Sequence, residues 1–265
     1  MNPRTILALL TRYVLLYTRN PVRSFELFFW PIVQLLMWGF VSTSLRNQGG
    51  TGAHGFVPSL IAATILWDAL FRSQQGVAIS FLEDVWTRNL LNIFAAPVRM
   101  SEYVAAACAV GILRVVITGI VLVVIAWLAY SFNLLQFQLP LIAWYVNLML
   151  FGWVLGIISI ALIVKWGHGA ESLAWAIPFM IQPFSAVFFR VQDLPPWMQA
   201  VSWAMPPAHV FEGMRGVMAG QPLDWRHLGV AFGLNAVYFL FAGWLFSRTL
   251  ASAREKGQLV KVSSS

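Results

Sequence analysis

Long apolar stretches constrain this chain more than any other feature of its sequence. About six of them reach the roughly 20 residues that a helix needs to cross the hydrocarbon of a bilayer. They are Phe25–Leu45, Phe56–Ser80, Tyr103–Tyr130, Pro140–Val164, Leu173–Phe189 and Leu228–Phe246. Only 10% of the 265 residues are charged, against about 25% in soluble domains. We therefore predict an all-α, polytopic membrane protein with about six transmembrane helices, built as one domain over residues 1–265.

The basic residues predict how the chain is oriented in the membrane. An even number of spans places both termini on one side, and most of the Lys and Arg residues outside the spans fall on that side. They are Arg4, Arg12, Arg19, Arg23, Arg88, Arg99, Lys165, Arg248, Arg254, Lys256 and Lys261. The positive-inside rule then makes both termini cytoplasmic. Because the basic residues follow topology, we expect no nucleic-acid partner, and the lack of an N-x-S/T sequon favours a prokaryotic plasma (inner) membrane.

Residues 81–97 form a charged, amphipathic segment between two apolar spans. Its apolar residues recur at three- and four-residue steps, which predicts a helix with one apolar side. These residues are Leu82, Val85, Trp86, Leu90, Ile93 and Phe94. Glu83, Asp84 and Arg88 fall on the other side, and Pro97 ends the segment. It is either a linker in the membrane surface or a lever that receives work from a partner.

Two further segments are too amphipathic or too irregular to be plain loops. Residues 1–24 contain a short amphipathic helix with Arg4, Arg12 and Arg19 on its polar side, and Asn20-Pro21 then turns the chain. This pattern is typical of an interfacial helix, although a charged tail that only fixes orientation would also fit. Residues 190–215 contain paired prolines around short apolar runs. We predict external, re-entrant helices there, with a surface helix as the alternative.

Three charged residues lie inside predicted spans. Asp68 and Arg72 are four residues apart, which places an acid and a base on one helix face, and Arg114 lies at a depth from which it could approach either. Unpaired charges are costly in a membrane, so we expect pairing. They form either a polar pathway lining or an internal ion pair that holds the spans together. The motifs Gly152-x-x-x-Gly156 and Gly229-x-x-x-Gly233 predict close helix contacts.

The sequence lacks the patterns of several catalytic and metal sites. Cys108 is the only cysteine, and the four histidines show no metal-ligand spacing. There is no G-x-S-x-G elbow and no G-x-x-x-x-G-K-[ST] phosphate loop. We therefore predict no catalytic residue, no metal site and no nucleotide site in this chain.

Two stretches together resemble the membrane permease subunits of ABC-2 type transporters. The first is Glu83 followed by Arg88–Val98 (RNLLNIFAAPV) and Glu102-Tyr103. The second runs from Phe184–Phe189 (FSAVFF) through Leu194–Met198 (LPPWM) to Pro206–Arg215 (PPAHVFEGMR). Two positions depart from the family pattern. Thr87-Arg88-Asn89 replaces the usual glycine-threonine, and Ala208 follows the two prolines where threonine is common.

The resemblance implies an exporter of glycans, lipids or drug-like molecules. Its partners would be a second copy of the chain, separate P-loop ATPase subunits that hold ATP and Mg, and membrane lipids. Residues 81–97 would be the coupling helix, and the N-terminal helix would also touch the ATPase. The implied ATPase-coupling residues are Arg12, Glu83, Asp84, Trp86, Arg88, Leu90 and Phe94. The external helices, with Trp197, Trp203, Glu212 and Arg215, would form the outer gate.

Two other functions fit the composition. An ion-coupled secondary carrier could use Asp68, Arg72 and Arg114, but such carriers usually show internal repeats, which we do not find. An intramembrane lipid-modifying enzyme would need a nucleophile or an acid–base pair, and the sequence offers no clear one.

Overall fold

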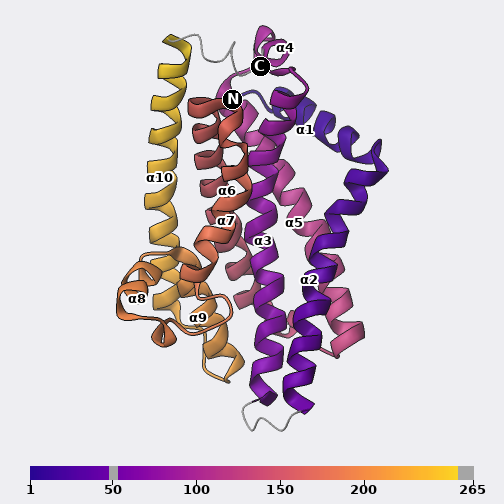
Figure 1. Ribbon diagram of the computed structural model, residues 1–265, viewed down its shortest axis with the longest axis vertical. Helices are drawn as coiled ribbons and strands as arrows, with labels where there is room; N and C mark the ends of the chain where they lie inside the picture. Colours follow the sequence, from indigo (N-terminus) through magenta and orange to yellow (C-terminus); the bar gives the residue numbers. More distant parts are fainter. Residues whose placement is uncertain (48–52, 256–265) are drawn as a thin grey trace.

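The computed structural model describes residues 1–47 and 53–255, and these are helical with no strand (Figure 1). The α-helices are α1 (Pro3–Thr18), α2 (Pro21–Asn47), α3 (Ala53–Trp86), α4 (Leu90–Ala95), α5 (Met100–Tyr130), α6 (Gln138–Trp166), α7 (Glu171–Ile181), α8 (Pro196–Trp203), α9 (Pro206–Met218) and α10 (Trp225–Glu255). Short 3-10 turns connect several of them. The structure thus confirms the prediction of an all-α, polytopic membrane protein.

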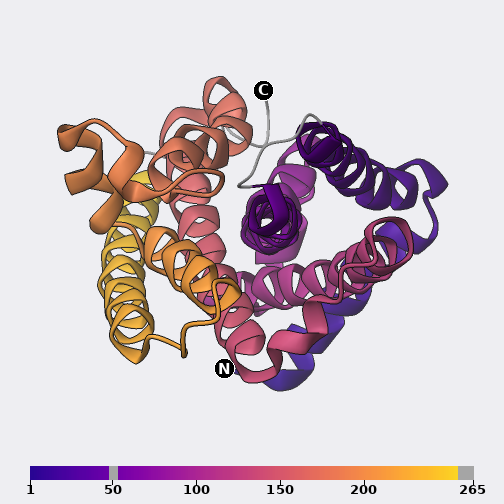
Figure 2. The same ribbon diagram turned by 90° about the horizontal axis from the view of Figure 1, so that it is seen from below.

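Four helical segments of the described chain are long and apolar enough to cross a membrane. They are Pro21–Val41, Met100–Tyr130, Leu134–Trp166 and Trp225–Ala253. Helix α3 is longer, with 34 residues, but its middle carries Asp68, Arg72 and the polar run Ser73–Gln75. Figure 2 shows α3 end-on in the interior of the bundle, and its neighbours are α2, α5, α6 and α7. The central helix is therefore less apolar than three of its neighbours, α5, α6 and α7.

The predicted span Leu173–Phe189 is not one continuous helix. Helix α7 ends at Ile181, and a 3-10 turn over Gln182–Ser185 follows. Pro183 is the second residue of that turn, and a proline has no N–H to continue an α-helix. Ala186 then adopts a left-handed conformation with φ 52°. Hydropathy does not distinguish helix α7 from the 3-10 turn that follows it, because both segments are apolar.

Close helix contacts at glycine hold α3 in place. A Cβ atom on Gly76 of α3 would lie 2.3 Å from the Cα atom of Gly111 in α5. On α6, a Cβ atom on Gly152 would lie 2.5 Å from the carbonyl oxygen of Leu70. The first small-residue motif therefore packs α6 against α3, as predicted. A Cβ atom at Gly229 or Gly233 would meet no described atom within 4 Å, so the second motif makes no such contact within the described chain.

The two ends of the bundle differ. Helix α1 lies across the end of the bundle that also carries α4 (Figure 1), and it packs on α5 and α2. Helices α8 and α9 lie toward the other end, where α9 packs on α6 and α10. Helix α1 is amphipathic as predicted, with Leu9 and Tyr13 buried. Its position in a membrane surface stays a prediction.

Candidate functional site

The segment 81–97 is two helices joined by a turn. Phe81–Trp86 is the end of α3, Thr87–Asn89 form the turn, and α4 begins at Leu90. The N–H of Asn89 donates to the Asp84 carbonyl at 2.9 Å and that of Arg88 to the Val85 carbonyl at 3.0 Å. These two bonds, with Arg88 left-handed at φ 53°, form a Schellman motif. The prediction of one unbroken helix was wrong. A glycine usually marks this motif in a sequence, and here an arginine occupies the position.

Most of the predicted apolar stripe is buried against the bundle. Leu82, Val85, Leu90 and Ile93 are buried, and Phe94 is half-buried. Trp86 is the exception, because 46% of it is exposed. Arg88 is also exposed and makes no ion pair among the described residues. Trp86 and Arg88 thus mark the accessible part of the α3–α4 junction.

Asp84 lies at the centre of a buried polar cluster. It forms an ion pair with Arg12 of α1. The hydroxyls of Tyr13 and Tyr103 donate to its second carboxylate oxygen at 2.6 and 2.7 Å. Asp84 itself is 0% exposed. The prediction that Asp84 lies on an outward, charged face was wrong, because its partners are two helices of the same chain.

Glu83 is directed in the same way toward its own chain. Its carboxylate is 3.2 Å from Arg23 Nη1 of α2 and accepts a bond of 3.4 Å from the Tyr17 hydroxyl. Glu83 is buried, so it too was wrongly placed on the outward face. The pairs Arg12–Asp84 and Arg23–Glu83 together fasten α1 and α2 to the last turns of α3.

The electrostatics of α1 follow from this cluster. Burial lowers the pKa of Arg12, but the hydrogen bond and negative charge of Asp84 outweigh it and raise the pKa above its usual value. Burial and the same carboxylate raise the pKa of the Tyr13 hydroxyl. Arg12 is therefore a permanent cation beside Asp84, and the Tyr13 hydroxyl is a permanent hydrogen-bond donor to it.

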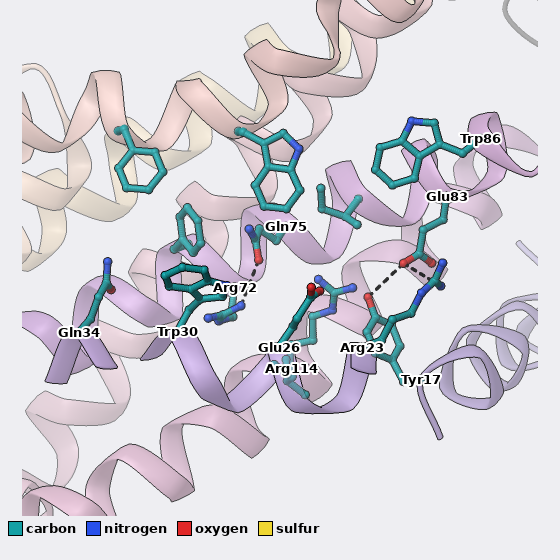
Figure 3. A pocket seen from close by; sticks show the side chains of 15 residues that line it. Tyr17, Arg23, Glu26, Trp30, Gln34, Arg72, Gln75, Glu83, Trp86 and Arg114 are labelled. Atoms are coloured by element: carbon teal, nitrogen blue, oxygen red, sulfur yellow. Dashed lines mark hydrogen bonds and ion pairs between the residues drawn. The ribbon is translucent and has the colours of Figure 1, made fainter. Parts of the chain in front are cut away.

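A cavity of about 550 Å³ opens beside this junction, between α2, α3, α5 and α7. Figure 3 shows charged side chains from several helices converging on it. Its aromatic lining consists of Tyr17, Trp30, Phe71, Trp86, Trp175 and Phe179, and its charged lining of Arg23, Glu26, Arg72, Glu83 and Arg114. Such a mixture of aromatic faces and a few polar groups is typical of a binding site for an amphipathic molecule. Trp86 and Glu83 belong to both the junction and the cavity.

The structure pairs Asp68 with Arg72, as the sequence predicted. Arg72 Nε lies 3.1 Å from Asp68 Oδ1, and both residues are buried. The Thr118 hydroxyl donates to Asp68 at 2.9 Å, and Arg72 donates to the Gln75 side chain at 3.1 Å. The pair is an internal ion pair, and its arginine also lines the cavity.

Arg114 joins neither Asp68 nor Arg72. Its guanidinium lies over the Tyr17 ring, with the Cζ atom 4.6 Å from the ring centroid. Its Nε and Nη2 atoms are buried without a hydrogen-bond partner in the described part of the chain. The expectation that Arg114 would be paired was therefore wrong for these atoms.

Three of the four predicted gate residues come together near the other end of the bundle. Trp203, Glu212 and Arg215 line a second cavity of about 330 Å³. Arg215 forms an ion pair of 3.0 Å with Glu212 and donates to the Ala186 carbonyl at 2.7 Å. Trp197 does not line this cavity; its ring packs edge-on against Phe184, with centroids 6.3 Å apart. A gating role for this group stays a prediction.

Sequence reasoning missed a histidine pair beside this cavity. The Nδ1 atoms of His209 and His227 are 3.2 Å apart, and Nε2 of His209 is 2.9 Å from the Trp203 carbonyl oxygen. The two histidines come from α9 and α10 and are separated by 18 residues. No local spacing rule connects them, so only the packing of α9 on α10 reveals the pair.

The long apolar helices and the charged cavity between them define an all-α, polytopic membrane protein. The sequence model of the family described as ABC-2 type transporter matches residues 4–219. That match covers most of the chain, and the protein belongs to this family. It is thus a transmembrane permease of ABC-2 type. No curated protein sequence matches the chain.

Proposed function

We propose that the chain is the membrane half of an ATP-driven exporter in a prokaryotic plasma membrane. Two copies would pair, and separate P-loop ATPase subunits would bind ATP and Mg and hydrolyse the nucleotide at the cytoplasmic end. The substrate would be a glycan, a lipid-linked glycan or another amphipathic molecule, moved outward. Both termini, α1 and the α3–α4 junction would lie on the cytoplasmic side.

The observation that carries this proposal is the fastening of three helices at one accessible junction. Trp86 and Arg88 are exposed there, while the neighbouring Glu83 and Asp84 pair with α2 and α1. A displacement of the junction would move these helices together, because their separation would leave the buried carboxylates of Glu83 and Asp84 without partners. Helix α2 and the end of α3 also line the aromatic cavity. ATP-dependent motion of a partner would thereby shift the population of open and closed cavities.

The Arg88→Gly variant tests the coupling role. Glycine suits the left-handed conformation at this position, so the change removes the guanidinium without straining the turn. In vesicles that contain the permease and its ATPase, we expect ATP hydrolysis to continue while export falls about tenfold, a loss of about 1.4 kcal/mol of coupling. Arg226→Gln, an exposed arginine at the start of α10, is the matched control.

Unchanged export and ATPase rates in Arg88→Gly and in Trp86→Ala would refute the proposed lever. The same vesicles separate an ATP-driven exporter from an ion-coupled carrier. Transport that persists without the ATPase and follows a proton or sodium gradient would support the carrier. The hydrogen bonds of Asp68 to Arg72 and Thr118 favour a structural pair over an ion relay.

A further inference from the structure

Arg114 is a buried cation directed into the aromatic cavity without an anionic partner. It is 6% exposed and lines the cavity from α5. Two of its three nitrogen atoms, Nε and Nη2, make no hydrogen bond to any described residue. An unpaired charge inside a bilayer is energetically unfavourable. A bound anion that pairs with the Arg114 guanidinium would remove this unfavourable term.

None of the carboxylates near the cavity pairs with Arg114 among the described residues. Asp68 pairs with Arg72, and Glu83 pairs with Arg23. Glu26 lines the cavity too, but no ion pair within 4.0 Å joins it to Arg114 among the residues that the structure describes, and Glu26 is exposed to solvent. Figure 3 shows the three arginines and two glutamates around the cavity, with dashed lines at Glu83 but none at Arg114.

The Tyr17 ring does not replace a counter-ion. Its centroid is 4.6 Å from the Arg114 Cζ atom, which is the distance of a cation–π contact. A guanidinium that stacks on a ring by its face keeps its N–H groups free along the edge. Those edge donors match the two oxygen atoms of a carboxylate or phosphate.

We propose that Arg114 binds the anionic head group, a phosphate or carboxylate, of an amphipathic substrate. This inference rests on the proposed function and adds the substrate class. The rest of the molecule would pack on the aromatic lining, in which Trp30 of α2 is 59% and Phe179 of α7 is 49% exposed. An apolar tail can thus leave the cavity between these two helices, and a volume of about 550 Å³ accommodates a head group with its first linked atoms.

Ligand binding to the full-length chain in neutral micelles, without any ATPase, tests this assignment. The probes are dihexanoyl phosphatidic acid, inorganic phosphate and the uncharged dihexanoyl glycerol, measured by isothermal titration. We expect phosphatidic acid to bind, and Arg114→Gln to weaken it at least about tenfold, as the loss of a charge-assisted bond requires. Arg114→Lys keeps the charge but loses the planar pair of edge donors, so we expect its binding to lie between that of the wild type and that of Arg114→Gln.

The inorganic phosphate arm identifies the source of the anion. Weak phosphate binding beside tight phosphatidic acid binding supports an amphipathic substrate. Equally tight binding of both, lost together in Arg114→Gln, overturns the amphipathic part of the proposal and assigns the site to free anions. Binding of the uncharged dihexanoyl glycerol as tight as that of phosphatidic acid, or no effect of Arg114→Gln on binding, overturns the anion site itself.

A stability control separates recognition from structure. If Glu26 and Arg114 formed a structural pair, Glu26→Gln and Arg114→Gln would both lower the melting temperature, and that result would overturn the proposal. We expect Arg114→Gln to melt at or above the wild-type temperature, because it removes an unpaired buried charge. Since this assay contains no ATPase, a failure of ATP-driven export would leave its outcome unaffected.

Discussion

The Asp84→Ala substitution should detach α1 from the bundle. Asp84 accepts two tyrosine hydroxyl bonds and an ion pair from Arg12, and it is fully buried. A hydrogen bond to a charged group is worth about 1.5–3 kcal/mol. The Arg12 side chain is 30% exposed, so the ion pair is screened and adds only about 0.5–1 kcal/mol. The two hydroxyl bonds and the ion pair together amount to roughly 3.5–7 kcal/mol, and the lower part of this range overlaps the roughly 3–5 kcal/mol lost when one partner of a buried pair is removed.

We therefore expect Asp84→Ala to lower the free energy of unfolding by about 4 kcal/mol. Titration with sodium dodecyl sulfate in dodecyl maltoside micelles, followed by circular dichroism, measures this loss. Hydrogen exchange should at the same time speed up over α1 (Pro3–Thr18) more than over α6. Glu26→Ala removes an exposed carboxylate from α2 and should change stability by less than about 0.5 kcal/mol.

A double-mutant cycle with Tyr103→Phe isolates one bond of the cluster. Tyr103 is buried on α5 and donates to Asp84 at 2.7 Å. We expect a coupling energy of about 1.5–3 kcal/mol between the two changes. Additive effects, or a loss below about 1 kcal/mol for Asp84→Ala with unchanged exchange over α1, would show that the cluster does not fasten the helix.

Three further predictions concern packing, pH and the second cavity. Gly76→Ala should lower the free energy of unfolding by about 1–3 kcal/mol, because its Cβ atom would meet backbone at 2.3 Å. Gly233→Ala, whose Cβ atom would meet nothing within 4 Å, should leave the free energy of unfolding unchanged or raise it in the same assay. Burial and the neighbouring His227 lower the pKa of His209, while its bond to Trp203 partly opposes them. The stability that neutral His209 provides is complete above its unfolded pKa of 6.5 and is lost as the pH falls through its lower folded value. The melting temperature should therefore drop between pH 7.5 and 5. An equal drop in the melting temperature of a His209→Asn variant would contradict this. Arg215→Met removes the donor to the Ala186 carbonyl and should lower the free energy of unfolding by about 1–3 kcal/mol. Hydrogen exchange over residues 186–191 should become faster, and unchanged exchange there would refute this prediction.

The sequence predicted the features that depend on neighbours in the chain. Hydropathy located the long helices, and three- and four-residue periodicity identified α1 and the buried stripe of Leu82, Val85 and Leu90. The ion pair of Asp68 with Arg72 follows from helix geometry alone, because it joins residues four apart.

The sequence failed where a residue's partner lies far along the chain. Asp84 resembled an outward-facing acid, but Arg12 and Tyr13 are 72 and 71 residues away and bury it. The turn at Arg88 was missed because arginine seldom adopts the left-handed conformation that ends α3. The Nδ1 contact of His209 with His227 likewise exists only once α9 packs on α10.

The polar centre of α3 also has a consequence for how the protein is made. Ser73 donates to the Met149 carbonyl and Gln74 to the Ala174 carbonyl, which are 76 and 100 residues further along the chain. At about 5–20 residues per second, the ribosome needs roughly 4–20 s to synthesise these 76 to 100 residues. During this interval α3 has emerged without the carbonyls that satisfy it, and hydrocarbon offers none. Helix α3 should therefore stay beside the insertion machinery, or in contact with water, until α6 and α7 arrive.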